Sequence, residues 1–394
     1  MPASLTPDLA LSSQPGPDFA LSEEQDLLRE QIRRFAEERI APGVRERDRN
    51  HEFPRDILRE MGELGLLGML IPETYGGAGM DPLSYVVAIE EIARICPSLA
   101  VTMSVTNSVC CWPIWRYGTE EQRRTVLREL ASGECIGGFG LTEPGSGSDA
   151  GSMRTTARRD GDSWVLSGEK AWITNAGEAR YFVVLAKTDV AAGKRGISAF
   201  VVPANAPGFE VGKPEEKLGL RSSLTAPLHF DDCRIPTASL LGAEGQGFKI
   251  ALATLDHSRL GIAAQAVGIH QRALELASSY AQERVQFGVP IGEHQAIQFM
   301  LARVATELAA ARVLTHAAAL AEQRSDAGRL AAQAKLYAAE AANRACYDAL
   351  QVHGGNGFCE DYEIARLYRD VRVTTIYEGT SEMQRLVIAR HLLA

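Results

Sequence analysis

A glutamate near the C-terminus has the surroundings of a catalytic base. Glu378 follows a largely apolar or β-branched run, residues 371–377, and precedes Gly379, which can supply a tight bend. A lone carboxylate beside an aromatic ring in such a run is poorly solvated, and poor solvation raises its pKa and makes it a stronger base. Ser381 and Gln384 have the spacing of a capping box, so we expect a helix to begin at Ser381. Taken alone, the segment also fits an ordinary solvated loop.

A run rich in glycine and serine, residues 141–149 with the sequence LTEPGSGSD, can bind a phosphate or a flavin edge through backbone N–H groups and hydroxyls. Gly145, Gly147 and Ala150 match the dinucleotide fingerprint G-x-G-x-x-A. That fingerprint requires a following helix, whereas residues 154–166 are strand-like, so a Rossmann site is disfavoured. A plain surface turn is the alternative.

Three further segments carry groups that can contact a flat or anionic ligand. Trp172, at a strand end beside Thr174, can form the wall of a site for a planar ring, although a core tryptophan has the same pattern. Asp256 and Arg259 are three residues apart on a helix and can face one ligand, or form a surface ion pair. Arg284 ends a long helix, where it complements the helix dipole or meets a phosphate.

Three glycines lie within four residues of the segment 351–358, QVHGGNGF. They let the backbone approach a ligand closely, although a helix C-cap and turn has the same composition. His353 fits the partner of a helix carbonyl better than a catalytic group. The eight histidines include no H-x-x-x-H pair, so a metal hydrolase is disfavoured and no metal is expected.

Composition bounds the class of protein. The 394 residues suffice for two or three domains with a large core. A net charge of −9 without a Lys/Arg cluster argues against nucleic acid, and no apolar run reaches the length of a membrane span. The seven cysteines form no C-x-x-C pair and suit a reducing cytoplasm. Residues 1–20 resemble neither a signal peptide nor a transit peptide, and we expect a disordered tail there.

Hydrophobic periodicity divides the remaining chain into an N-terminal helical domain (21–135), a central β domain (136–242) and a C-terminal helical bundle (243–394). A capping box at Ser22 and Gln25 opens the first helix. Further helices are expected over 56–65, 82–95, 119–131, 248–281, 296–324 and 330–352. Strands are expected over 181–186, 197–202 and 228–230, with a hairpin of 164–166 and 171–174 around a turn at 167–168.

Taken together, these motifs resemble the acyl-CoA dehydrogenase family over residues 21–394. The resemblance is carried by LTEPGSGSDAG, GEKAWITNAG, ERVQFGVPIGEHQAIQ, QVHGGNGF and IYEGTSEMQRLVIARHLL. Residues 103–105, the run LGLRSS and the C-terminal stretch are most similar to the short-chain, butyryl-CoA-type branch. The resemblance implies an α+β multidomain fold with an N-terminal helical domain, a β-barrel-like middle domain and a C-terminal four-helix bundle, FAD as cofactor and a homotetramer.

The resemblance also implies roles for individual residues. Glu378 is implied as the catalytic base, with Tyr377 and Gly379 beside the substrate. Residues implied to hold the CoA moiety are Ser148, Asp256 and Arg259. Those implied to line the isoalloxazine of FAD are Phe139, Leu141, Thr142, Trp172 and Thr174. Arg284, Gln286 and Phe287 of a neighbouring subunit, with Gln351 and Gly355, are implied to meet the pyrophosphate and adenosine, and Thr380 and Glu382 to reach FAD as well.

The implied reaction is α,β-dehydrogenation of a saturated acyl-CoA, expected to be short-chain (C4–C8), to trans-2-enoyl-CoA in fatty acid β-oxidation. Glu378 removes the α-proton, flavin N5 accepts the β-hydride, and the Glu378 N–H and a ribityl hydroxyl bond the thioester oxygen. An electron-transfer flavoprotein is the expected electron acceptor, and a bacterial cytoplasm the expected location.

Two positions bear on this assignment. Isovaleryl-type members carry their base at the position of Ser258, and serine cannot serve as one, which favours Glu378. Ala253 is expected at the pocket bottom, where short-chain members have glutamine, so we expect a deeper pocket with activity peaking at C4 to C6. The alternatives are an acyl-CoA oxidase or flavin monooxygenase on the same fold, or a non-catalytic helical scaffold. Oxygen access decides between a dehydrogenase and these two oxygen-using enzymes, and a colourless protein would indicate the scaffold.

Overall fold

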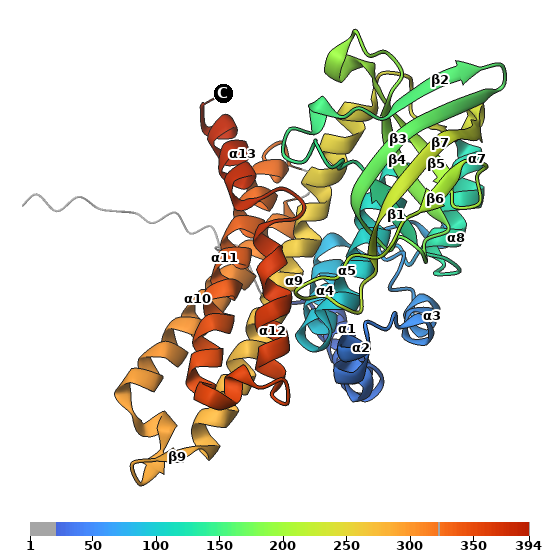
Figure 1. Ribbon diagram of the computed structural model, residues 1–394. Coiled ribbons are helices and arrows are strands. Elements are labelled where there is room, and N and C mark those ends of the chain that lie inside the picture. The colour runs from blue at the N-terminus through green and yellow to red at the C-terminus, as the bar shows by residue number, and fades with distance from the viewer. Residues whose placement is uncertain (1–20, 322–323, 394) are drawn as a thin grey trace, which may run out of the picture.

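The computed structural model describes residues 21–321 and 324–393, in which helices, a sheet and a second set of helices follow one another along the chain (Figure 1). This order confirms the predicted α+β fold with an N-terminal helical part, a central β part and a C-terminal bundle. The predicted tail at 1–20 lies outside the described residues.

Helices of the N-terminal part run into one another, in places through short π-helical turns. The predicted capping box opens the first of them, with Ser22 Oγ accepting the Gln25 N–H at 3.2 Å. Asp81 caps the fourth by accepting two backbone N–H groups at 2.9 Å. The helices are α1 (Glu23–Phe35), α2 (Val44–Asn50), α3 (Arg55–Glu63), α4 (Pro82–Ile95), α5 (Pro97–Val105), α6 (Trp112–Tyr117), α7 (Glu120–Gln122) and α8 (Arg128–Ala131).

The central part is a mixed sheet that does not close into a barrel among the described residues. Its strands follow the order β6-β7-β3-β2-β4-β5-β8, and β1 pairs with β4 in parallel. The strands are β1 (Gly137–Gly140), β2 (Thr156–Asp160), β3 (Ser163–Thr174), β4 (Tyr181–Lys187), β5 (Ile197–Pro203), β6 (Phe209–Val211), β7 (Thr225–Pro236) and β8 (Leu240–Leu241).

The hairpin predicted from 164–166 and 171–174 is wrong. These residues belong to one strand, β3, which pairs with β7 along its length. The Ser-Gly pair that suggested a turn marks a bulge instead, because the register shifts between Leu166 and Gly168 and Gly168 has φ of 140°. The actual hairpin joins β2 to β3, which pair in antiparallel register from Asp160 and Ser163 onward.

Long helices form the C-terminal bundle. α9 is the longest and extends from the sheet to a two-stranded ribbon at the far tip of the bundle (Figure 1). α12 is absent from the predicted helices, although its buried Ile364, Leu367 and Val371 have helical spacing. No described helix is long and apolar enough to cross a membrane. The elements are α9 (Gly247–Glu283), β9 (Val285–Gln286), β10 (Val289–Pro290), α10 (Gln295–Leu320), α11 (Ala327–His353), α12 (Glu363–Val371) and α13 (Ser381–Leu393).

The helices at the two ends of the chain share one hydrophobic core. Ile92 of α4, Val267 of α9 and Ala338 of α11 belong to the same buried cluster. A second cluster joins the sheet to the helices and includes Val183 of β4 and Ile250 of α9. The N-terminal helices, the sheet and the bundle therefore all pack against α9.

Candidate active site

Glu378 lies on a tight loop between a 3-10 turn (Arg372–Thr375) and α13. Glu378 has φ of 54° and the following Gly379 has φ of 87°. The left-handed conformation is unfavourable for a residue with a side chain and persists only where surrounding contacts hold it. The loop is therefore a strained segment that the rest of the protein must fix in place.

The Glu378 carboxylate is bonded to the first third of α9. Ser258 Oγ, which is fully buried, donates a hydrogen bond to Glu378 Oε2. Burial raises the pKa of Glu378 above its ordinary value, while the Ser258 hydrogen bond and the positive charges of Lys335 and Arg259 limit that rise. Part of the Glu378 residue stays exposed, so it is the burial of the remainder that raises the pKa of the carboxylate.

Two side chains donate to the carbonyl groups of this loop. Lys335 Nζ of α11 donates to the Gly379 carbonyl at 2.7 Å. Gln384 Nε2 of α13 donates to the same carbonyl at 2.8 Å and to the Glu378 carbonyl at 3.2 Å. These hydrogen bonds account for the persistence of the left-handed turn.

The cap of α13 differs from the prediction. The helix begins at Ser381 as expected, but Thr380 provides the capping oxygen, since its Oγ1 accepts the Met383 N–H at 3.3 Å. Gln384 is not part of a capping box because its side chain is bonded to the loop carbonyls instead.

On its inner side, α9 is sealed against the N-terminal helices close to Ser258. A Cβ at Gly261 would overlap the hydroxyl groups of Ser104 and Tyr85, which are bonded to each other at 3.2 Å. Gly261 lies only about 4.5 Å further along the helix axis than Ser258. The stretch of α9 that can border a substrate next to the carboxylate therefore ends within one helical turn of Ser258.

Gln265 continues this face of α9 by another turn. Its buried amide Nε2 donates to the Pro97 carbonyl at 2.8 Å, and its Oε1 accepts a hydrogen bond from the Tyr377 hydroxyl. The ring preceding Glu378 is thereby tied to the start of α5. Gln265 is absent from the predicted site, although a lone amide within the apolar stretch 260–269 was an available signal.

The residues predicted to hold CoA do not all come together. Asp256 and Arg259 form an ion pair on α9, with side-chain exposures of 48% and 7%. They flank Ser258 in sequence on α9. Ser148 is exposed on the loop after β1, and no hydrogen bond or ion pair joins it to them in the described part of the chain.

The residues predicted to line a flavin gather at one end of the sheet. Trp172 has φ of 62° and is 60% exposed, at a point where the register of β3 shifts. The Ala171 N–H donates to the Thr142 carbonyl at 2.9 Å, and Asn175 Nδ2 donates to the Gly137 carbonyl at 2.9 Å. The end of β3 is thus joined to β1 and its following loop. The residues on these segments are Phe139, Leu141, Thr142, Trp172 and Thr174.

A buried ion pair anchors the glycine-rich loop. Lys170 Nζ lies 2.8 Å from Glu143 Oε1, with side-chain exposures of 0% and 6%. Glu143 also accepts the backbone N–H groups of Arg154 and Thr155, at 2.5 and 3.0 Å. Burial opposes the ionisation of Glu143, but Lys170 and these donors outweigh it and lower its pKa. The glycines beyond the anchor face open space, since an added Cβ at Gly145 or Gly147 would contact nothing within 4 Å.

Arg284, Gln286 and Phe287 lie at the opposite end of α9, in the ribbon at the bundle tip. Arg284 is 25 positions after Arg259, which corresponds to about 37 Å along a helix. Phe287 is 94% exposed and has φ of 56°. These side chains cannot reach the Glu378 of their own chain.

The segment with Gln351 and Gly355 reaches the same tip. Asn356 Nδ2 donates to the Tyr280 hydroxyl near the end of α9 at 3.0 Å. His353 stacks on Tyr280 with ring centroids 4.3 Å apart, and its Nδ1 is bonded to the Ala349 carbonyl at 2.7 Å. The arrangement gives His353 the carbonyl-bonding position expected from the sequence. Thr380 and Glu382, in contrast, lie beside Glu378 at the start of α13.

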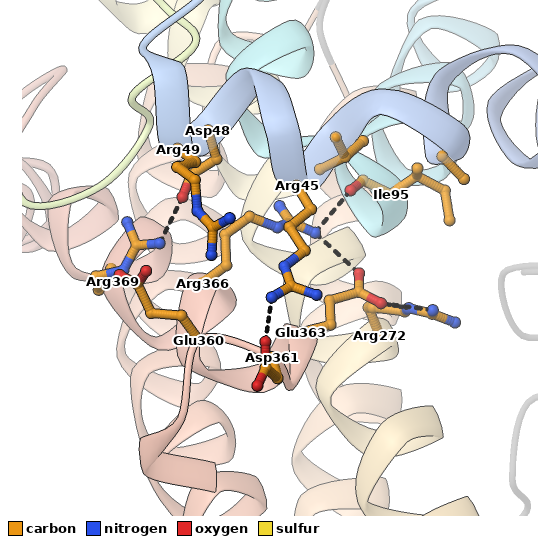
Figure 2. A pocket seen from close by; sticks show the side chains of 12 residues that line it. Arg45, Asp48, Arg49, Ile95, Arg272, Glu360, Asp361, Glu363, Arg366 and Arg369 are labelled. Atoms are coloured by element: carbon orange, nitrogen blue, oxygen red, sulfur yellow. Dashed lines mark hydrogen bonds and ion pairs between the residues drawn. The ribbon is translucent and has the colours of Figure 1, made fainter. Parts of the chain in front are cut away.

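A charged pocket of about 150 Å³ between α2 and α12 is separate from this site (Figure 2). Its charges largely satisfy one another: Arg369 is paired with Asp48, and Arg366 Nη2 lies 2.8 Å from Glu363 Oε1 and also donates to the Ile95 carbonyl. The network ties the N-terminal helices to the bundle, and none of its residues is a predicted site residue.

Sequence models for the three parts of one family match in succession along the chain. They are the acyl-CoA dehydrogenase N-terminal domain over residues 22–134, the middle domain over 138–233 and the C-terminal domain over 245–393. The chain belongs to the acyl-CoA dehydrogenase family.

Members of the family from other organisms are similar over almost the whole chain. The mitochondrial short-chain specific acyl-CoA dehydrogenase of Bos taurus is 52% identical over 95% of this chain and 91% of its own length. The butyryl-CoA dehydrogenase of Megasphaera elsdenii has a TM-score of 0.94 at 42% identity, over 96% of this chain and all of its own. A chain in the structure of the electron transferring flavoprotein of Acidaminococcus fermentans has a TM-score of 0.94 at 45% identity, over 95% of this chain and 99% of its own.

As an acyl-CoA dehydrogenase, the protein is a FAD-dependent oxidoreductase. The residues at the end of the sheet fit a flavin. Trp172 presents an exposed ring in a backbone conformation unusual for a side chain of its size. The loop at Gly145 and Gly147 borders open space, since an added Cβ at either glycine would contact nothing within 4 Å. An exposed indole ring is suited to packing against a planar tricyclic ring.

Proposed function

We propose that this acyl-CoA dehydrogenase oxidises short-chain saturated acyl-CoA thioesters to trans-2-enoyl-CoA, with Glu378 as the base. The observation that carries the proposal is the Glu378 carboxylate, which is poorly solvated, bonded to Ser258 and placed on a strained loop. A carboxylate with a raised pKa is a stronger base than an exposed one and is matched to removing a weakly acidic proton.

The loop offers the other group that enolate formation needs. The Glu378 N–H has no acceptor among the described residues, so it can donate to the thioester oxygen as negative charge develops there. Ser258 orients the carboxylate towards the α-carbon, and Glu378 takes the α-proton. FAD, when bound, supplies the acceptor for the hydride that leaves the β-carbon. Tyr377 and Gly379 contact the substrate as neighbours of the base.

We also propose roles for the remaining predicted residues, as the family resemblance implies. Asp256 and Arg259 hold the CoA moiety beside Ser258 on α9, with Ser148 approaching it from the glycine-rich loop. FAD is lined by the five residues at the sheet end, with Thr380 and Glu382 beside the base. Arg284, Gln286, Phe287, Gln351 and Gly355 are assigned to the pyrophosphate and adenosine of a neighbouring subunit's FAD, as the family resemblance implies, and their distance from their own Glu378 is consistent with that assignment.

The acyl chain length is set by Gln265 rather than by Ala253. Ala253 is five residues before Ser258, about 140° around the helix, and so lies off the face that carries the base partner. Gln265 is on that face, bonded to Tyr377 and buried. Together with the sealed contact at Gly261, it supports a preference for C4 to C6, with some C8 turnover.

Gln265→Ala is expected to raise the C8/C4 ratio of kcat/KM, because removing the amide lengthens the space beside the base. Accommodation of one or two more methylenes is worth roughly 1–3 kcal/mol, a change of about 10-fold or more. The ratio is measured with butyryl-, hexanoyl- and octanoyl-CoA. Ala253→Gln is the matched control and should leave the ratio unchanged. A fall in the ratio in that control would restore Ala253 as the pocket floor.

Arg284→Ala is expected to reduce flavin retention and homotetramer content together. Arg284 is exposed and forms no ion pair within residues 21–321 and 324–393, so its guanidinium is available for charge-assisted bonds to a phosphate across a subunit boundary. Flavin absorbance and molecular mass are measured after gel filtration. Arg284→Lys, which keeps the charge without the planar fork, should be intermediate. Full flavin content in an intact tetramer would mean that Arg284 serves only its own helix end.

Anaerobic mixing with a panel of acyl-CoAs tests the function directly. Bleaching of the flavin by butyryl-CoA, with formation of the 2-enoyl product, is the expected result. Electrons then pass to an electron-transfer flavoprotein, a partner supported by the similar chain in the Acidaminococcus fermentans structure. Rapid reoxidation in air would indicate an oxidase instead. The cytoplasmic location stays a prediction.

A further inference from the structure

Lys335 is a fully buried lysine on α11, directly under the catalytic loop. It lies among buried alanines in the stretch 331–342, and no carboxylate lies within ion-pair distance of it in the described part of the chain. An ammonium group is costly to bury, so this position needs a compensating interaction. The interaction found is the 2.7 Å hydrogen bond to the Gly379 carbonyl.

That carbonyl belongs to a backbone segment that requires support. Glu378 and Gly379 have successive positive φ values of 54° and 87°, and such a conformation relaxes when the surrounding contacts are removed. Two donors, Lys335 and Gln384, are bonded to the Gly379 carbonyl. Of these two donors, only Lys335 carries a positive charge.

We propose that Lys335 is a positioning residue for the catalytic base: the hydrogen bond from its ammonium group to the Gly379 carbonyl fixes the Glu378–Gly379 turn that carries the base. The proposal rests on the assignment of Glu378 as the base. Lys335 acts through the loop and does not contact the substrate, so a change at Lys335 should alter kcat more than KM.

The charges around Lys335 are consistent with this role. Burial lowers the pKa of Lys335 to about 8, with Arg259 of α9 acting in the same direction and Glu378, Glu340 and Glu382 opposing it. The group is therefore mainly protonated at neutral pH. Its charge lowers the pKa of Glu378 in turn, so loss of the charge should move the pH at which the base ionises upward.

Lys335→Met removes both the donor and the charge at similar length. We expect kcat for butyryl-CoA to fall by about 10- to 100-fold, as for a base displaced by a fraction of an ångström, with flavin content unchanged. The acidic limb of the kcat/KM–pH profile should move to higher pH. A lysine that only supports the fold would lower the melting temperature and leave this limb where it is. A kcat within twofold of wild type with an unmoved limb would overturn the proposal.

Gln384→Met is the matched control, because it removes the uncharged donor to the same carbonyl. It should lower kcat without moving the acidic limb, and an equal shift of the limb in both variants would show that charge is not the cause. If Lys335→Met does not fold, Lys335→Gln, which lacks the charge, must show the same limb shift. Glu378→Gln separates the base assignment from the role of Lys335. An active Glu378→Gln enzyme would overturn the base assignment. An inactive Glu378→Gln enzyme together with an unaffected Lys335→Met enzyme would overturn only the role of Lys335.

Discussion

Replacing Glu378 with glutamine is expected to slow dehydrogenation by about 10²- to 10⁴-fold, the range that general-base catalysis contributes, while FAD stays bound. Glutamine keeps the volume and can still accept the Ser258 hydrogen bond, but it cannot take up the α-proton. The measurement is the anaerobic rate of flavin bleaching by butyryl-CoA. A variant with more than about a tenth of the wild-type rate would contradict the assignment, because it would lie outside that range.

The pH dependence of the wild-type enzyme provides an independent check on the base. Glu378 must be ionised to accept a proton, so activity should be lost as the pH falls through its pKa. Burial raises that pKa, and kcat/KM for the free enzyme should therefore decline at a higher pH than an exposed glutamate would give. A profile that stays flat down to the ordinary range of glutamate would show that the carboxylate is well solvated in solution.

Lys170→Met is expected to destabilise the folded protein by about 3–5 kcal/mol, the usual cost of breaking a buried ion pair from one side. The substitution leaves the Glu143 carboxylate, 6% exposed, without its cation. The glycine-rich loop that Glu143 anchors should loosen, and flavin should be retained less well. Urea unfolding of the FAD-loaded enzyme and flavin content after gel filtration are the two measurements.

The double variant Lys170→Met/Glu143→Gln separates the charge from the packing. It removes the stranded carboxylate, and the amide oxygen can still accept the N–H groups of Arg154 and Thr155. It should therefore recover much of the stability that Lys170→Met loses. Equal unfolding midpoints for Lys170→Met and wild type would show that the pair contributes little to the anchor.

Much of the site was accessible from local sequence, and the rest depends on contacts between distant segments. The loop position of Glu378, the β3 position of Trp172 and the helix carrying Asp256 and Arg259 follow from short patterns. Ser258 is bonded to Glu378 across 120 positions, which no local pattern reveals. Lys335 is hidden for a similar reason, since an isolated lysine in an alanine-rich helix usually faces solvent.

The errors in the predicted elements have local causes. The Ser-Gly pair at 167–168 has the composition of a turn and of a bulge alike, and only pairing with β7 decides between them. Gln384 has the position of a capping-box residue relative to Ser381, but its side chain donates to the Glu378 and Gly379 carbonyls instead. Alternating apolar and polar residues in the β part predict strands, but they do not predict whether the sheet closes into a barrel. The open, mixed order of the sheet was therefore not predictable from this pattern.

The unbroken length of α9 has a consequence for how the chain can vary. Its 37 residues connect the Ser258 segment to the ribbon carrying Phe287 with no loop in which a length change could be absorbed. Deleting one residue between Arg259 and Glu283 would rotate the ribbon by about 100° and shift it by about 1.5 Å relative to the base. If the ribbon completes the site of another subunit, a deletion in α9 would disable the catalytic centre of that other subunit, although α9 itself lies beside the Glu378 of its own chain. Insertions and deletions should therefore be tolerated in the surface loops of the sheet and excluded from this stretch of helix.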